Sequence, residues 1–256
     1  MSPSTIRRLV GVILLVLWEV LPRAGLVPQL FLPPLSQVIA VGIADWRLFA
    51  EALLVTLSEA SVALIFACGG GILAGALIGS VARLRGLLLP VVSSLYAVPL
   101  VVLYPVFTAW FGIGAQSKIA FASIYGFFPT LLGTAAGIQT IDAQLLVTAR
   151  SMGATLSQRL RHVVLPAAIP TVIASLRLGG ALVIVGVVVS EMLTSSAGIG
   201  YLITSYRTVL DSPRVYVGIL LVLLLGVLLD VGMRLLERAA TRHRAAEMPR
   251  RAAPAI

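Results

Sequence analysis

Four ionisable side chains lie in or beside long apolar stretches of this sequence. Arg177 interrupts the apolar stretch 168–192, where inserting an arginine costs roughly 2.5–3.5 kcal/mol, so it should face protein or a water-filled cavity. Two interpretations stay open: it attracts an anion that passes through that cavity, or it is a structural partner for a carbonyl or carboxylate. Glu191 is expected to be a solvated interfacial acid, with a part in an outer gate as the alternative. Asp230 and Arg234 are four residues apart and should pair on one helix.

The sequence offers no residue set for catalysis or metal binding. A phosphate-binding loop ends in Gly-Lys-Ser/Thr, whereas Lys118, the only lysine, is followed by Ile119. Cys68 is the only cysteine, which leaves no internal disulfide or thiolate cluster. His162 and His243 stand apart from other metal-binding side chains. We therefore predict no catalytic residue, no metal site and no cofactor.

The composition indicates a membrane protein with many spans. Of its 256 residues, 59% are hydrophobic and only 11% are charged, whereas a soluble domain has about a quarter of its residues charged. A span needs about 20 apolar residues, so the chain can hold five or six spans and no sizeable soluble domain. The apolar runs place six spans at about 9–22, 60–82, 87–111, 118–140, 168–192 and 214–233.

These spans predict an all-α polytopic membrane protein with one domain over residues 1–256. Its N-terminal part, 1–59, comprises an anchor span and, from residue 33, an amphipathic outer segment. A core over 60–236 and a basic tail over 237–256 follow. Because Arg7 and Arg8 precede a short apolar run, a secretory signal peptide is the alternative to the anchor, although no small-residue cleavage site follows.

The positive charge favours one orientation in the membrane. If the N terminus is inside, the inner segments hold thirteen of the 19 basic residues and the outer segments hold five, Lys118 among them, while Arg177 lies within a span. The positive-inside rule then places both termini and the loop 141–166 in the cytoplasm. The net charge of +9 does not indicate nucleic-acid binding, because the arginines lie in short turns between apolar runs.

Two spans carry helix-packing or helix-bending signals. Glycines at 71, 75 and 79 should form a groove in which another helix can approach closely. Because this signal is common in membrane bundles of every function, it indicates helix packing. The third span contains prolines at 90, 99 and 105, each expected to bend it. Tyr96 and Tyr104 lie near these bends, so they either line a path through the membrane or pack against neighbouring helices.

The inner loop is the most patterned segment of the chain. It reads VTARSMGATLSQRLRHVVLPAAIP over residues 147–170. Leu145, Ala149 and Met152 share one helical face, and Gly153 is a natural helix end. A second short helix should follow over 156–164 and end at Leu165–Pro166. Such a bent helix pair has a shape that fits a groove in a soluble partner.

This loop resembles the EAA loop of ABC importer permeases, in which Glu-Ala-Ala, three residues, Gly, nine residues and Ile-x-Leu-Pro follow one another. All these spacings match. The resemblance assigns ATPase coupling to Val147, Thr148, Ala149, Arg150, Gly153, Val163, Leu165 and Pro166. The Glu and first Ala of the triplet are Val147 and Thr148 here, so a charge-assisted contact, worth about 1.5–3 kcal/mol if buried, is lost. Docking then depends on shape, on Gly153 and on Arg150.

Further segments resemble the nitrate, sulfonate and taurine branch of this family. They are LPPLSQV at 32–38, WFGIGAQSKI at 110–119, YGFFPTLLGTAAGI at 125–138 and LRLGGAL at 176–182. The resemblance implies a multi-pass permease homodimer in the lipid of the bacterial cytoplasmic (inner) membrane. Its implied partners are two ATP-binding ATPase subunits and a periplasmic or lipid-anchored binding protein. The resemblance also implies a path for a small oxyanion or sulfonate, with Arg177, Tyr96, Tyr104 and Glu191 as candidate path residues. An ion-coupled secondary transporter is the alternative, although we find no repeat and no mid-span carboxylate.

Overall fold

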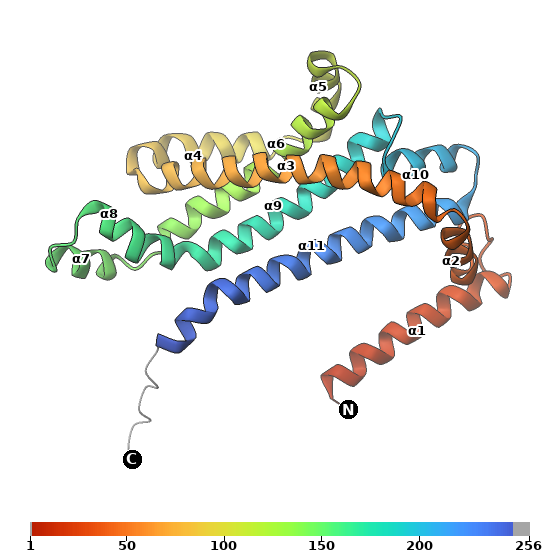
Figure 1. Cartoon of the computed structure of the whole chain (residues 1–256), viewed down its shortest axis with the longest axis horizontal. Helices are drawn as coiled ribbons and strands as arrows, with labels where there is room; N and C mark the ends of the chain where they lie inside the picture. Colours follow the sequence, from red (N-terminus) through yellow and green to blue (C-terminus); the bar gives the residue numbers. More distant parts are fainter. Residues whose placement is uncertain (1, 248–256) are drawn as a thin grey trace.

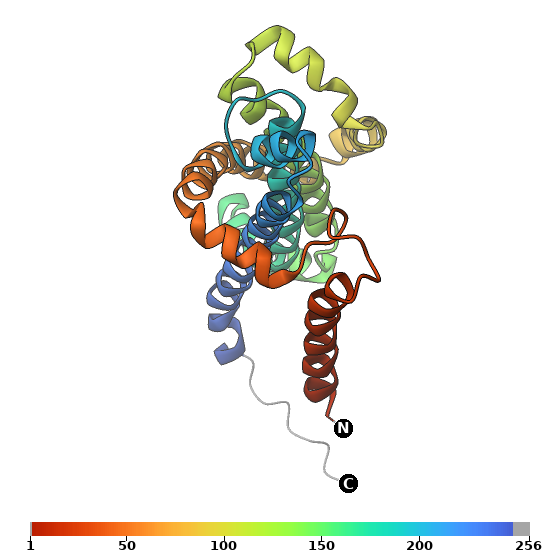
Figure 2. The ribbon, with the colours of Figure 1, turned by 90° about the vertical axis from the view of Figure 1, so that its right-hand side faces the viewer.

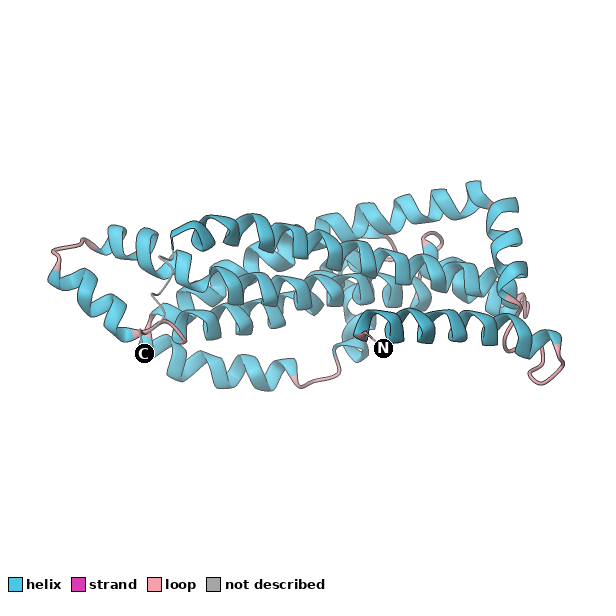
Figure 3. Cartoon of the chain, turned by 90° about the horizontal axis from the view of Figure 1, so that it is seen from below, coloured by secondary structure: helices cyan, strands magenta, loops and turns pink. Residues whose placement is uncertain are grey.

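The structure, a computed structural model, describes residues 2–247 and contains only helices, turns and loops in that range (Figure 3). The helices are α1 (Pro3–Arg23), α2 (Leu35–Ala44), α3 (Trp46–Ser80), α4 (Ala82–Tyr96), the 3₁₀ turn η1 (Leu100–Leu103), α5 (Tyr104–Phe111), α6 (Ala115–Gln139), α7 (Ala143–Ser151), α8 (Leu156–Arg159), the π-helical turn η2 (Leu160–Val164), α9 (Leu165–Leu193), α10 (Ile199–Thr208) and α11 (Ser212–Glu247).

Four helices of the described chain are long and apolar enough to cross a membrane. They cover Trp46–Ser80, Ala115–Gln139, Ser157–Leu193 and Ser212–Arg238, and the pair α4 and η1–α5 makes a fifth span if it counts as one. The predicted first span lies in α1, which does not belong to this set. Every 18-residue window of α1 contains Arg7, Arg8 and Glu19, and these charges lower its apolar character.

The second span begins earlier than the sequence indicated. Residues 33–59, predicted to be an amphipathic outer segment, form α2 and the first fourteen residues of α3. The boundary placed at residue 60 therefore falls inside one continuous helix. The charged residues of this stretch suggested an outer segment. Arg47 and Glu51 are indeed exposed, but Glu59 is buried in the bundle and pairs with a residue of another helix.

Helices α3, α6 and α9 lie side by side and form the centre of the bundle (Figure 1). Backbones approach closely here: a Cβ atom added at Gly75 would lie 2.5 Å from the carbonyl oxygen of Leu131. Gly71 and Gly79 also face α6, where an added Cβ would lie 2.7 Å from Cβ of Thr130 and 3.0 Å from Cα of Ala135. The predicted glycine groove is thus confirmed as a helix-packing surface.

The predicted third span is broken. Helix α4 and the segment Leu100–Phe111 meet at an angle of 81°. Of the three prolines, Pro99 lies at the break, where its ring and extended backbone end the helical path. Pro90 lies inside α4 and Pro105 in the first turn of α5, a position where a missing N–H is tolerated. We therefore attribute the bend to Pro99.

The bundle has two distinct ends. Helices α7 and α8 form one end, near the beginning of α4, whereas α2, α5 and α10 lie toward the opposite end (Figure 1). Helix α1 stands beside the bundle rather than within it (Figure 2). It is tied at its C-terminal end, where Trp18 Nε1 donates a hydrogen bond to the carbonyl oxygen of Pro33 at 3.0 Å and the Trp18 ring lies 5.8 Å from that of Tyr216.

Candidate functional site

The loop end of the bundle is built around a glycine hinge. Helix α7 begins at Asp142, whose carboxylate accepts a hydrogen bond from the backbone N–H of Gln144 at 2.8 Å. It ends before Gly153, which has φ +75° and donates its N–H to the carbonyl oxygen of Arg150 at 2.9 Å. Because L side chains rarely adopt this backbone conformation, glycine is favoured at this position. The predicted break at Gly153 is confirmed.

The second arm of the loop runs directly into the next span. Thr155 and Gln158 cap it reciprocally: the Gln158 side chain accepts from the Thr155 N–H at 2.8 Å, and the Thr155 hydroxyl accepts from the Gln158 N–H at 3.3 Å. The helix then continues through η2 into α9, so the prediction that Leu165–Pro166 ends it was wrong. Pro166 lies in the first turn of α9, where a proline is tolerated. The π-helical turn η2 just before it has i→i+5 hydrogen bonds in place of the α-helical bonds that a proline disrupts. The second arm is therefore mechanically continuous with α9.

The loop presents an apolar surface that no part of this chain covers within the described residues. Leu145, Val147 and Met152 are 50%, 60% and 81% exposed. Where such a surface lies outside the lipid, it is typical of a site that a partner protein covers. The remaining predicted coupling residues divide between exposed Thr148, Arg150, Gly153 and Leu165 and half-buried Ala149, Val163 and Pro166.

At the other end of the bundle, Glu191 is buried, and the prediction of a solvated interfacial acid was wrong. Its side chain is 1% exposed. One carboxylate oxygen accepts from the Thr56 hydroxyl at 2.8 Å, and the other accepts from the Gly200 N–H at 2.8 Å. The carboxylate fills the turn at Gly198 (φ +101°), where an added Cβ would lie 2.0 Å from it. Glu191 thus ties α9 to α3 and to the start of α10.

A buried ion pair lies in the same region, and the sequence analysis missed it. Lys118 Nζ lies 2.5 Å from Glu59 Oε1, and both side chains are about 5% exposed or less. Lys118 also donates to the Ser195 hydroxyl at 3.2 Å. The sequence analysis placed Lys118 outside and Glu59 in an outer segment, and it found no mid-span carboxylate; Glu59 instead lies well inside α3. The signal in the sequence that could have revealed the pair is Lys118 itself, a single lysine at the start of an apolar stretch. A lysine that becomes buried there is expected to pair with a carboxylate.

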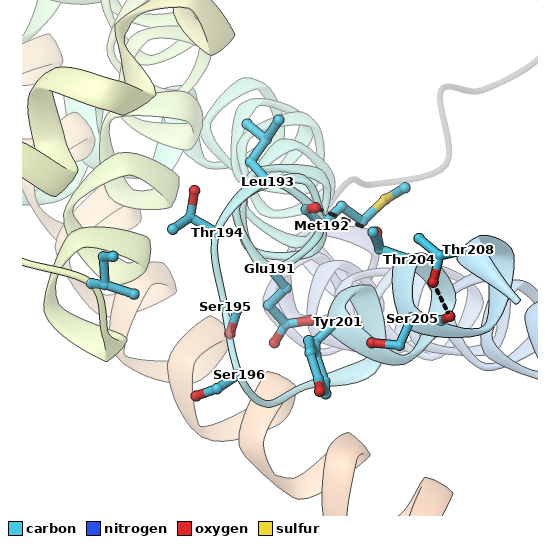
Figure 4. A pocket seen from close by; sticks show the side chains of 11 residues that line it. Glu191, Met192, Leu193, Thr194, Ser195, Ser196, Tyr201, Thr204, Ser205 and Thr208 are labelled. Carbon is cyan, nitrogen blue, oxygen red and sulfur yellow. Dashed lines mark hydrogen bonds between the residues drawn. The ribbon is translucent and has the colours of Figure 1, made fainter.

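These polar groups lie beside a cavity of about 380 Å³ between α9 and α10. Figure 4 shows the side chains of Glu191, Ser195 and Tyr201 around it, on the loop 194–198 and the adjoining helices. We call Thr56, Glu59, Lys118, Glu191 and Ser195 the polar latch, because together they join α3, α6, α9 and the 194–198 loop.

The two candidate aromatic path residues differ in burial. Tyr104 is 1% exposed, its ring lies 5.1 Å from that of Phe121, and its hydroxyl donates to the carbonyl oxygen of Thr194 at 3.4 Å. These contacts favour packing for Tyr104. Tyr96 is 36% exposed and lies 6.1 Å from the ring of Phe128.

Arg177 has carboxylate partners on α11. Its guanidinium lies 2.8 Å from Glu237 Oε2 and 3.3 Å from Asp230 Oδ1. Asp230 also pairs with Arg234 at 2.7 Å, which confirms the predicted i, i+4 pair. Of the two interpretations left open for Arg177, these contacts favour the structural partner. Among the described residues, no group of three or more His, Cys, Asp or Glu side chains could hold a metal ion.

Comparison with known proteins shows which family the chain resembles. Residues 69–242 match the family described as the binding-protein-dependent transport system inner membrane component. The chain is 32% identical over 239 residues to the putative aliphatic sulfonates transport permease protein SsuC of Bacillus subtilis, covering 92% of this chain and 86% of that protein. It is 31% identical over 236 residues to the taurine transport system permease protein TauC of Escherichia coli, with 90% and 86% covered.

The fold also matches solved structures. The inward-facing MetNI methionine ABC transporter superposes with a TM-score of 0.69 at 20% identity, covering 77% of this chain and 98% of that one. An amino acid ABC transporter crystallised with histidines superposes with a TM-score of 0.61 at 17% identity, covering 80% and 97%. At these identities the likeness shows the fold alone, which is that of the type I ABC importer permeases.

The chain belongs to the binding-protein-dependent ABC importer permeases of the inner membrane. It is the membrane-spanning permease subunit of such an importer and not an enzyme, because ATP hydrolysis resides in a separate ATPase subunit. The family and fold class predicted from the EAA-like spacing are thereby confirmed. The alternative of an ion-coupled secondary transporter is set aside.

Proposed function

We propose that two copies of this chain form the path by which a small sulfonate or related oxyanion enters the cell. The substrate class is supported by the relatives named for aliphatic sulfonates and taurine. A formylaminopyrimidine permease, ThiX of Halalkalibacterium halodurans, is 30% identical over 224 residues, so the permease fold does not fix the substrate. The binding protein supplies most of the selection.

One observation carries the coupling mechanism. The hinged pair α7–α8 leaves apolar residues exposed on its first arm, while its second arm is continuous with α9. A push on α7 and α8 by a closing ATPase pair is therefore transmitted to α9, which carries Glu191 of the polar latch at its far end. Alternating access follows: ATP binding closes the ATPases and opens the outer end, and hydrolysis returns the spans to the inward-facing state.

The orientation of the chain in the membrane is part of the same proposal. Both termini and the hinged loop lie in the cytoplasm, and the end with α10 faces the periplasmic or lipid-anchored binding protein. The arginine-rich segments at the α7–α8 end support this orientation. ATP is bound by the partner ATPase, and the permease itself requires no cofactor.

Uptake into vesicles tests the proposal. The chain is co-expressed with the ATPase encoded beside it, and uptake of radiolabelled taurine is measured with its binding protein present. The expected result is co-purification of the two subunits and uptake that requires ATP and survives an ionophore. Uptake that collapses with the ionophore and proceeds without ATP would contradict the proposed energy source.

The substrate class has its own readout. ATPase activity of the reconstituted complex is measured with the binding protein loaded with taurine, an alkanesulfonate or a formylaminopyrimidine. Stimulation by the sulfonates alone supports the proposal, and stimulation by the pyrimidine alone contradicts the substrate class without affecting the coupling mechanism.

A further inference from the structure

A second cavity, of about 270 Å³, lies at the α7–α8 end of the bundle, far from the polar latch. Its walls come from the end of α3, the start of α4, the end of α6, and both arms of the hinged loop. The lining residues are Gly79, Ser80, Arg85, Ile138, Ile141, Leu146, Arg150, Arg159 and Val164. The site is therefore assembled from five parts of the chain that only this fold brings together.

Three guanidinium groups line this cavity, and no carboxylate does. Arg159 Nε is buried and has no hydrogen-bond partner among the described residues. Arg85 donates only a long bond, 3.4 Å, to the carbonyl oxygen of Gly79. No ion pair involves Arg85, Arg150 or Arg159 in the described part of the chain. Every other cavity-lining residue is uncharged.

The buried Nε–H of Arg159 is unfavourable without an acceptor, because it has lost water and gained nothing in its place. Arginine is also the side chain whose planar set of donors best fits the oxygens of a phosphate group. The arrangement thus has the chemistry of an anion site, and phosphate is the group that matches a cavity lined by three arginines and no carboxylate.

We propose that this cavity binds the phosphate of an anionic phospholipid. The remaining walls are mostly apolar, with Ile138, Ile141, Leu146 and Val164 beside the arginines. A free phosphate ion would leave these side chains without a partner, whereas the glycerol and upper acyl carbons of a lipid would cover them. The cavity also lies where α3 and α6, two helices long and apolar enough to cross a membrane, end, and basic cavities between membrane helices on the cytoplasmic side bind such headgroups.

The bound lipid would touch both arms of the hinge. Arg150 precedes Gly153 on α7 and Arg159 follows it on α8. An occupied site would hold the two arms at one angle and attach both to the ends of α3 and α6. Lipid binding itself does not depend on which solute the permease carries, so failure of the substrate assignment leaves this proposal untouched.

Binding of radiolabelled phosphatidylglycerol to the purified permease–ATPase complex tests the proposal. The site variant is R85Q/R159Q. The matched control is R83Q/R161Q, which removes two positive charges from the same two segments at residues that are exposed and do not line the cavity. Lipid retention after delipidation should fall about tenfold to thirtyfold in the site variant, because two charge-assisted contacts of cavity-lining arginines to the bound phosphate are lost. The control should stay within about twofold of the unaltered complex, because Arg83 and Arg161 do not line the cavity and, as exposed charges, are screened by salt.

Three further measurements make the outcome decisive. Phosphatidylcholine should not compete with phosphatidylglycerol, and inorganic phosphate should compete only weakly. Equal retention in the site variant and the control would overturn the proposal. Strong competition by inorganic phosphate would overturn the lipid as the source of the anion. If R85Q/R159Q loses the ATPase on purification while R83Q/R161Q keeps it, the arginines instead meet carboxylates of the ATPase, and the lipid assignment is wrong.

Discussion

At the scale of single residues, the pair Glu59–Lys118 differs from the other described ion pairs because both of its side chains are buried. Both side chains have left water, and such pairs add little net stability over apolar residues of similar size. Removing only one partner is different, because the other charge then stays buried without compensation. The pair therefore acts as a geometric constraint that fixes α6 against α3 and holds the loop at Ser195.

Replacing Glu59 with Gln should lower the free energy of unfolding by about 3–5 kcal/mol. The double variant Glu59→Met/Lys118→Met should recover most of this loss, because it removes both buried charges. Arg234→Met, which breaks an exposed pair with Asp230, is the matched control and should change stability by less than about 1 kcal/mol. Denaturant unfolding of the detergent-purified protein measures all three. A Glu59→Gln protein as stable as the control would show that the pair is not buried as described.

Substitution of Arg177 distinguishes its two interpretations. If the arginine is a structural partner of Asp230 and Glu237, Arg177→Gln should reduce stability and leave the KM for uptake within about twofold. Its side chain is a third exposed, so the expected loss is only about 1–2 kcal/mol after allowance for solvent screening. A KM that rises tenfold or more with stability unchanged would instead favour attraction of an anionic substrate.

Residue-level prediction succeeded where the partners are close in sequence. Asp230 and Arg234 are one helical turn apart, so their pairing is readable from spacing alone. The partners of Glu191 and Lys118 lie 135 and 59 positions away, at Thr56 and Glu59. Only the packing of α3 against α6 and α9 brings them together, and no local pattern in the sequence encodes those contacts.

At the scale of elements, the hinge at Gly153 determines how the two arms of the loop meet. Gly153→Leu should abolish stimulation of the ATPase by loaded binding protein while leaving membrane insertion intact. Leucine at φ +75° costs about 1–2 kcal/mol. We therefore expect the backbone at residue 153 to leave this conformation, which changes the angle between the two arms. The measurement is ATP hydrolysis by the reconstituted complex, with and without loaded binding protein.

Gly25→Leu provides the matched control for this hinge. Gly25 has φ +71°, and, as at Gly153, no atom lies within 4 Å of an added Cβ. The two substitutions impose the same backbone strain, but only one lies in the loop. Normal stimulation in Gly153→Leu, or an equal loss in Gly25→Leu, would refute the coupling role of this hinge.

Helix types and the hinge were predictable from the sequence, whereas helix continuity was not. Apolar runs identified α3, α6, α9 and α11, and a glycine after an amphipathic turn identified the end of α7. Pro166 suggested a helix end, yet η2 allows the chain to pass from α8 into α9 without interruption. The charges of 45–59 suggested an outer segment, yet Glu59 is neutralised inside α3 by a residue from another helix.

At the scale of the whole molecule, orientation is the property that decides which partner meets which end. Single cysteines at Ser157 and Val209, both exposed, should report opposite sides of the membrane in a Cys68→Ala background. A membrane-impermeant maleimide applied to intact cells whose outer membrane has been permeabilised should label Val209→Cys and not Ser157→Cys. The reverse pattern would invert the proposed orientation and with it the assignment of both ends.

The central claim, that the hinged loop receives the movement of the ATPase, is tested most directly by cross-linking from Met152, which is 81% exposed at the hinge. A benzophenone is attached to Met152→Cys in the Cys68→Ala background, and the complex with ATPase and loaded binding protein is irradiated. We expect a product of permease and ATPase whose yield changes between the nucleotide-free and ATP-bound states. A cross-link to the binding protein, or the absence of an ATPase product in both states, would contradict the account.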